Sequence, residues 1–237
     1  MLFLRATLFS AGMIVSTIIF ALLCPLTIVF PFTVRYRFIS QWRHFNLWLA
    51  KTVCHIDYEI AGIENLPDEP SIVFCKHQSA WETLAIARFL PPHVWVLKRE
   101  LLWVPFFGWG LAMLKPIAID RAAGRRAVKQ IIAQGKQRLA DGQWVVVFPE
   151  GTRVAAGQQK KFGIGGAILA EASGAPVVPI AHNAGYFWPR RQFIKQPGTV
   201  KVVIGKPIAT RGRKAADINA EAENWINDTV AQLGASS

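Results

Sequence analysis

The chain has 237 residues, a formal net charge of +12 at pH 7, and a composition in which 52% of the residues are hydrophobic. This length suffices for one α/β domain with a short appendage, and the apolar composition points to contact with lipid. Three isolated cysteines exclude a disulfide framework and a Cys-x-x-Cys metal site, which suits a reducing compartment. Because no nucleic-acid-binding motif accompanies the basic charge, we expect anionic lipid headgroups and substrates as partners, and no nucleic acid.

The first predicted element is a membrane segment, because residues 6–34 include no charged side chain. The run is longer than the roughly 20 residues that cross the hydrocarbon core. A cleaved signal peptide is the least favoured of three interpretations, because the apolar run is too long for one and Phe30-Pro31-Phe32 is a poor cleavage environment. Two further arrangements remain open. One is a single tilted crossing helix, and the other is a helical hairpin broken near Pro25, with a second helix beginning around Thr27. Residues 1–54 are therefore predicted to form membrane-anchoring helices.

The residues that follow this run indicate an orientation and a second helix. Four basic residues come after the run and only Arg5 precedes it, so the positive-inside bias places the rest of the chain in the cytoplasm. We therefore predict a bacterial-type inner membrane location, with the remaining domain on the cytoplasmic side. Aromatic residues recur at helical spacing, which is typical both of an interfacial amphipathic helix and of a helix packed on the core. The basic residues are Arg35, Arg37, Arg43 and Lys51, and the aromatic ones are Phe38, Trp42, Phe45 and Trp48.

Residues 55–237 are predicted to form one α/β domain, because short β-branched runs alternate with helical patterns. We expect a mostly parallel central sheet flanked by helices, since runs such as Trp144–Phe148 are apolar on both faces. The expected strands are Ile56–Ile60, Ser71–Cys75, Val94–Leu97, Pro116–Ile119, Trp144–Phe148, Val177–Ala181 and Val200–Ile204. The expected helices are Ala80–Phe89, Phe106–Met113, Arg121–Leu139, Gly163–Glu171 and Ala215–Leu233.

A histidine and a carboxylate stand at the start of the first helix of this domain. His77 follows the strand Ser71–Cys75, and ligands of open α/β sheets bind beyond the carboxyl ends of the strands. Ser79 and Glu82 have the spacing of a capping box, so we expect the helix to begin at Ala80. Either Glu82 only caps the helix beside a solvated His77, or its second carboxylate oxygen also accepts a proton from the imidazole. In the latter case His77 has a fixed tautomer and a free ring nitrogen that can act as a base.

A second group of polar residues ends the strand Trp144–Phe148. The sequence Phe148-Pro149-Glu150-Gly151-Thr152-Arg153 places opposite charges around a glycine. A strand-end loop that carries an arginine is a natural anion site, whereas the simpler interpretation is a surface ion pair. Taken with His77, the loop predicts a reaction that removes a proton from a hydroxyl of a phosphate-bearing substrate.

These motifs resemble those of the glycerolipid acyltransferase family, and most closely its 1-acylglycerol-3-phosphate (lysophosphatidic acid) acyltransferase branch. The resemblance extends from about Ile60 to Ile208 and includes Pro116–Arg121 and Val177–Ala181, although the family usually has Asp where this chain has Glu82. It implies acyl transfer from an acyl-CoA or acyl carrier protein thioester to the free hydroxyl of 1-acylglycerol-3-phosphate. The product would be phosphatidic acid for phospholipid synthesis.

The resemblance also implies roles for individual residues. His77 would take the hydroxyl proton and Glu82 would orient the imidazole, so both are predicted to be catalytic. Glu150, which cannot bind phosphate while ionised, would orient an arginine or a glycerol hydroxyl. No metal and no cofactor beyond the thioester co-substrate are expected, and the expected partners are the lysophosphatidic acid acceptor, the anionic bilayer surface and the acyl-CoA or acyl carrier protein. The predicted substrate site consists of Arg121, Glu150, Gly151, Thr152 and Arg153.

Three other functions remain open at this point. Glu82 in place of Asp keeps open an acyltransferase for another lysolipid, such as a lyso-amino-acid lipid. A membrane-bound acyl hydrolase would use the same base to activate water, and a lipid-binding module would need no base at all. Thiol release from the thioester in the absence of an acceptor distinguishes the hydrolase from a transferase.

Overall fold

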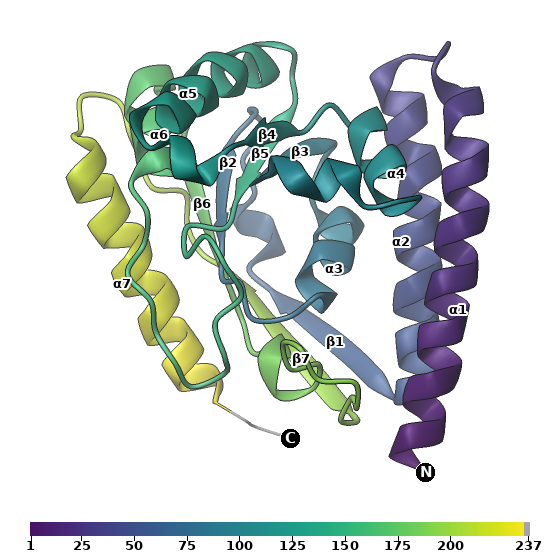
Figure 1. The fold of residues 1–237 in the computed structure, drawn as a ribbon. Helices are drawn as coiled ribbons and strands as arrows, with labels where there is room; N and C mark the ends of the chain where they lie inside the picture. The colour runs from purple at the N-terminus through teal and green to yellow at the C-terminus, as the bar shows by residue number, and fades with distance from the viewer. Residues whose placement is uncertain (235–237) are drawn as a thin grey trace.

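The computed structural model describes residues 1–234 and contains a seven-stranded sheet in the order β1-β7-β6-β2-β5-β3-β4 (Figure 1). All neighbouring strands are parallel except β6 and β7, which confirms the predicted mostly parallel sheet. Strand β2 lies in the middle, between β6 and β5, so the residues that follow it stand near the centre of one edge of the sheet. The strands are β1 (Ile56–Ala61), β2 (Ile72–Cys75), β3 (His93–Lys98), β4 (Ile117–Ile119), β5 (Trp144–Val147), β6 (Val177–His182) and β7 (Gly198–Ile204).

Helices cover both faces of this sheet (Figure 1). Helices α5, α6 and α7 pack on one face against Ile72 and Phe74 of β2, whereas α2 and α3 pack on the other against Val73 and Cys75. Alternate residues of β2 thus enter two different cores, and all four are fully buried. The helices are α1 (Leu2–Leu23), α2 (Phe32–Cys54), α3 (Trp81–Phe89), α4 (Phe107–Met113), α5 (Arg125–Ala140), α6 (Gly165–Ser173) and α7 (Ala215–Leu233).

The first two helices form an antiparallel hairpin that packs against the α/β domain (Figure 1). The chain leaves α1 through a 3₁₀ turn that contains Pro25, as expected, but the second helix begins at Phe32 rather than around Thr27. On the hairpin's inner side, Phe9 is fully buried and meets the ring of Trp188 edge-on at 5.0 Å. Among residues 1–234, one helical stretch is long and apolar enough to cross a membrane, by length and composition: Leu2–Thr27, which is α1 with the 3₁₀ turn that follows it.

The start of α5 differs from the expected boundary in a way that affects the site. The regular helix begins at Arg125, because a 3₁₀ turn over Arg121–Ala123 and Gly124 at φ +50° precede it. Asp120 caps this turn by accepting a hydrogen bond from the Ala122 N–H at 2.9 Å. Arg121 therefore lies in the loop after β4 rather than inside a helix.

Candidate active site

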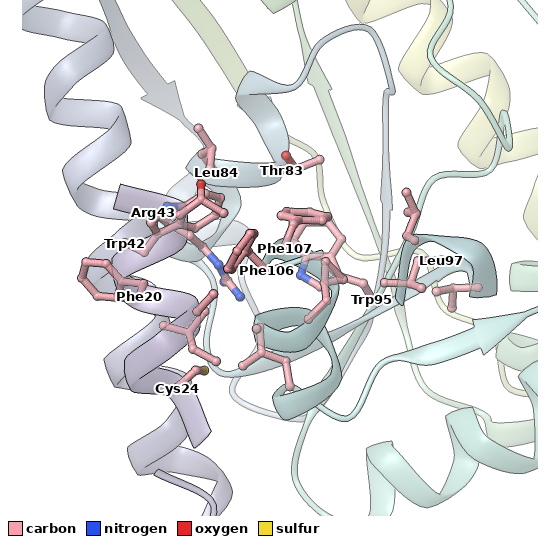
Figure 2. A pocket seen from close by; sticks show the side chains of 18 of the residues that line it. Phe20, Cys24, Trp42, Arg43, Thr83, Leu84, Trp95, Leu97, Phe106 and Phe107 are labelled. Atoms are coloured by element: carbon pink, nitrogen blue, oxygen red, sulfur yellow. The ribbon is translucent and has the colours of Figure 1, made fainter. Parts of the chain in front are cut away.

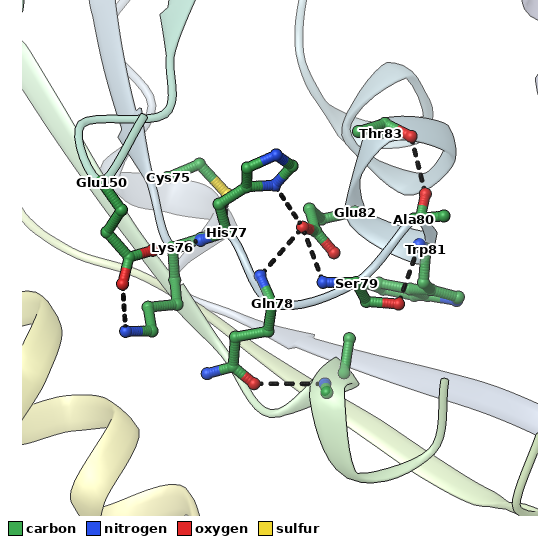
Figure 3. Close-up of polar contacts among 12 residues, drawn as sticks. Cys75, Lys76, His77, Gln78, Ser79, Ala80, Trp81, Glu82, Thr83 and Glu150 are labelled. Carbon is green, nitrogen blue, oxygen red and sulfur yellow. Dashed lines mark hydrogen bonds and ion pairs between the residues drawn. The ribbon is translucent and has the colours of Figure 1, made fainter. Parts of the chain in front are cut away.

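The imidazole of His77 is held in place by a carboxylate and an aromatic ring. His77 lies just beyond β2, and its Nδ1 is 2.8 Å from Oε1 of Glu82 (Figure 3). On its face the ring stacks on Phe148, with centroids 3.9 Å apart and planes inclined by 13°. These two contacts fix both the direction and the plane of the imidazole.

Glu82 also caps helix α3, as the sequence predicted. Its Oε1 accepts hydrogen bonds from the backbone N–H groups of Gln78 and Ser79 at 3.1 and 3.0 Å, and the Ser79 hydroxyl oxygen accepts one from the Trp81 N–H. The helix begins at Trp81, one residue later than expected. A single carboxylate oxygen thus serves both the cap and the imidazole, where one oxygen for each had been expected.

The charge of Glu82 defines the tautomer of His77, its partner in the His77–Glu82 dyad. Burial raises the pKa of Glu82, but the nearby His182 and the hydrogen bond from His77 outweigh burial, so the pKa lies below its ordinary value. Glu82 is therefore ionised at neutral pH and acts only as an acceptor. We assign the proton to Nδ1 of His77, which leaves the Nε2 lone pair free on the side of the ring away from Glu82.

Beneath His77 a buried ion pair links the two sequence motifs. Nζ of Lys76 is 2.5 Å from Oε1 of Glu150, and both side chains are buried (Figure 3). Oε2 of Glu150 accepts a hydrogen bond from the His77 backbone N–H at 2.8 Å, and the His77 carbonyl accepts one from the Val154 N–H at 2.8 Å. Burial raises the pKa of Glu150, and the ammonium of Lys76 opposes that rise.

The partners of Glu150 differ from those implied by the sequence. Within residues 1–234 it makes no ion pair with Arg121 or Arg153, and instead it holds the backbone of His77. The role of Lys76 was not predictable from the sequence, because a lysine after an apolar strand is ordinarily solvated.

A second histidine, also missed by the sequence reading, lies behind the dyad. His182, at the end of β6, accepts a hydrogen bond at Nδ1 from the Ala184 N–H (3.2 Å) and donates from Nε2 to the Lys76 carbonyl (2.8 Å). Nε2 also lies 3.9 Å from Oε2 of Glu82. Burial lowers the pKa of His182, so the ring is neutral and fixes the chain just before His77. The sequence feature that could have identified His182 is its position directly after the predicted strand Val177–Ala181.

The two predicted arginines lie at the same cavity as His77. Nη1 of Arg121 donates a hydrogen bond to the Gly151 carbonyl, which joins the loop after β4 to the loop after β5. Gly151 has φ +68°, a left-handed conformation that glycine adopts without strain. Thr152 is exposed and does not line the cavity. The structure therefore brings His77, Arg121 and Arg153 around one space, whereas Glu150 lies beneath it.

This cavity continues from the polar residues into an apolar interior between the hairpin and the sheet (Figure 2). Its volume is about 210 Å³. Helices α1 to α4 and strand β3 all contribute to its wall, which is mainly aromatic and aliphatic. The apolar lining includes Phe20, Ile39, Trp42, Leu84, Trp95, Leu97, Phe106, Phe107 and Leu111.

The chemistry available here is proton transfer next to an anion site. A neutral imidazole with a free Nε2 takes a proton, and an ionised carboxylate at Nδ1 stabilises the imidazolium that results. Two guanidinium groups nearby suit a phosphate. Within residues 1–234 no group of three or more His, Cys, Asp or Glu side chains is arranged to hold a metal ion.

Comparisons with known proteins agree with this arrangement. A model of the acyltransferase family matches residues 57–183. The chain is 50% identical over 209 residues to a 1-acyl-sn-glycerol-3-phosphate acyltransferase of Pseudomonas aeruginosa, covering 86% of this chain and 81% of that one. It is 28% identical to the enzyme of that name from Saccharomyces cerevisiae, covering 83% and 68% of the two chains.

A solved structure shares the fold. The crystal structure of the 1-acyl-sn-glycerophosphate acyltransferase PlsC from Thermotoga maritima superposes with a TM-score of 0.81 at 22% identity, covering 97% of this chain and 95% of that one. The family model and the P. aeruginosa relative establish what the fold alone does not: the chain belongs to the acyltransferase family.

Proposed function

We propose that the protein transfers a fatty acyl group from an acyl thioester to the free hydroxyl of 1-acylglycerol-3-phosphate, making phosphatidic acid for phospholipid synthesis. The P. aeruginosa and S. cerevisiae relatives, both named 1-acyl-sn-glycerol-3-phosphate acyltransferases, support this substrate. The observation that carries the proposal is a single cavity that contains His77, two arginines and an apolar interior. A lipid phosphate, a reacting hydroxyl and a fatty chain need these three environments side by side.

The reaction would proceed by general base catalysis. His77 Nε2 accepts the hydroxyl proton while the oxygen attacks the thioester carbonyl, and the imidazolium is stabilised by Glu82. When the tetrahedral intermediate collapses, the C–S bond breaks and the departing thiolate receives that proton. Arg121 and Arg153 would bind the phosphate of the acceptor, and the apolar wall would hold a fatty chain. The donor is acyl-CoA or acyl carrier protein, since either supplies the thioester.

A transfer assay tests this proposal. Purified protein receives labelled acyl-CoA or acyl carrier protein with a panel of lysolipids that includes lysophosphatidic acid and a lyso-amino-acid lipid, and the products are identified by mass. We expect phosphatidic acid from lysophosphatidic acid and little thiol release without an acceptor. Equal thiol release with and without an acceptor would identify a hydrolase. Acylation of the lyso-amino-acid lipid alone would show that this lipid, and not lysophosphatidic acid, is the acceptor.

The first mutational prediction concerns the phosphate of the acceptor. Arg153→Ala should raise the KM for lysophosphatidic acid about tenfold or more, because a charge-assisted hydrogen bond contributes roughly 1.5–3 kcal/mol. The KM for the acyl donor should change much less. The matched control is Arg126→Ala, which removes an exposed charge on α5 away from the cavity lining. Equal effects of the two substitutions on the acceptor KM would contradict a specific phosphate site at Arg153.

The second mutational prediction concerns the membrane. We propose that the hairpin enters the cytoplasmic leaflet of a bacterial inner membrane by its tip, where large apolar side chains are exposed. Replacing the tip residues with serine should impair acylation of bilayer substrate at least several-fold more than acylation of dispersed short-chain substrate. Deleting α1 is a poorer test, because it would uncover Trp188. Equal losses on both substrates would contradict this placement. The exposed tip residues are Leu26, Ile28, Val29 and Phe30.

A further inference from the structure

One buried positive charge in the cavity wall has no part in the chemistry described so far. Arg43 lies on α2 with 3% of its surface exposed, and it lines the same cavity as His77. Its guanidinium points from the helix toward the space beside Phe107 (Figure 2). Arg121 and Arg153 are partly or fully exposed, so Arg43 differs from them in being an interior cation.

The contacts of Arg43 leave its charge uncompensated. Its Nη1 donates a long hydrogen bond of 3.4 Å to the Tyr36 hydroxyl, and the guanidinium lies 5.1 Å from the centroid of the same ring. Tyr36 in turn is 2.9 Å from Nδ1 of His93. Burial, together with the charge of Arg43, lowers the pKa of His93 to about 3, so that ring is neutral. Across residues 1–234, no carboxylate lies within ion-pair distance of Arg43.

The surroundings restrict what such a group can bind. Trp42, Phe107 and Leu84 make the adjoining wall apolar, and a buried charge with unused N–H donors is costly in such a place. A ligand that offsets this cost must carry an acceptor oxygen into an otherwise apolar passage. Both substrates of the proposed reaction carry one such oxygen where the fatty chain joins the polar group, namely the carbonyl of the acyl ester or of the thioester.

We propose that Arg43 binds the carbonyl oxygen of a fatty acyl ester or thioester whose chain occupies the apolar part of the cavity. This inference rests on the proposed function, since it takes its ligand from that reaction. The guanidinium would distinguish an acyl chain from an alkyl chain of equal length. Arg43 is thus assigned as a substrate-binding residue that recognises the bond by which the chain is attached.

Two arms of one experiment distinguish the two carbonyl sources. In the first arm, 1-acyl- and 1-O-alkyl-glycerol-3-phosphate of equal chain length compete as acceptors for one donor, and the ratio of their kcat/KM values is measured. In the second arm, unlabelled acyl-CoA and its S-alkyl thioether analogue compete with a labelled acyl donor, and the ratio of their inhibition constants is measured. Each analogue lacks only the carbonyl. A hydrogen bond from a charged donor makes the carbonyl compound better by about tenfold or more.

The variants follow directly from the contacts. Arg43→Met should bring the ratio close to one in whichever arm carries the contact, and Arg43→Lys should retain part of it. The matched control is Arg37→Met, which removes an exposed charge from the same helix and should leave both ratios unchanged. Arg43→Met should not lower the melting temperature, because it removes an uncompensated buried charge.

The outcomes separate this inference from the function on which it rests. Absence of discrimination in both arms of the wild-type enzyme, with phosphatidic acid still formed, would overturn the inference alone. Unchanged discrimination in a folded Arg43→Met protein would do the same. If neither lysophosphatidic acid nor its ether analogue is acylated, the proposed function itself fails.

Discussion

His77→Ala should lower kcat for acyl transfer by about 10²–10⁴-fold, because a positioned general base contributes a factor of that size. The acceptor hydroxyl would have to lose its proton to water, whereas in the wild-type enzyme Nε2 is already aimed by Glu82 at 2.8 Å and by the ring of Phe148. The phosphate site proposed at Arg121 and Arg153 does not involve the imidazole. The KM for the acceptor should therefore change little, and steady-state kinetics at saturating thioester measure both values.

The folded state of the His77→Ala protein needs its own control. His77 is partly exposed, so its loss should shift the melting temperature by only a few degrees. Phe148→Leu serves as the matched variant, because it removes the stacked ring and keeps the base. It should lose less activity than His77→Ala. A loss below about tenfold for a folded His77→Ala protein would contradict a catalytic role.

Lys76→Met should lower the stability of the protein by about 3–5 kcal/mol, because it leaves the buried carboxylate of Glu150 without its partner. For a chain of this length, this corresponds to a fall in melting temperature of about 6–20 °C. Activity should fall as well, since Glu150 also holds the backbone N–H of His77. Thermal unfolding in detergent measures the first effect.

A second substitution tests whether Lys76→Met destabilises the protein because it leaves the buried charge of Glu150 unpaired. In the double variant Lys76→Met with Glu150→Gln, the amide oxygen can still accept the His77 N–H while no charge is buried. This protein should be more stable than Lys76→Met alone. The exposed pair Lys51–Asp57 is the control, since Lys51→Met should cost less than about 1 kcal/mol. A Lys76→Met protein as stable as Lys51→Met would contradict a structural role for the buried pair.

The sequence predicted the parts of the fold that depend on local pattern. Each β-branched run became a strand within two residues of its expected ends, and the capping box of Ser79 and Glu82 formed at the start of α3. The pairing of His77 with Glu82 could be expected for the same reason, because only four residues separate them across the start of α3 and the cap fixes the carboxylate.

Contacts between distant segments were not predictable in the same way. The partner of Glu150 depends on β2 and β5 lying side by side, which follows from the strand order rather than from either strand. His182 reaches Lys76 because β6 lies on the other side of β2. Arg43 was identified only as a basic residue near the membrane segment, because its burial depends on how the hairpin packs against the sheet.

Proton abstraction by His77 is tested most directly with an acceptor that needs no strong base. A 2-thiol analogue of lysophosphatidic acid ionises far more readily than the hydroxyl compound, since a thiol such as that of cysteine has a pKa near 8.5, far below that of an alcohol. The loss caused by His77→Ala should therefore shrink from about 10²–10⁴-fold on the hydroxyl acceptor to less than about tenfold on the thiol acceptor at pH 9. Equal losses on the two acceptors would contradict the role of His77 as the base.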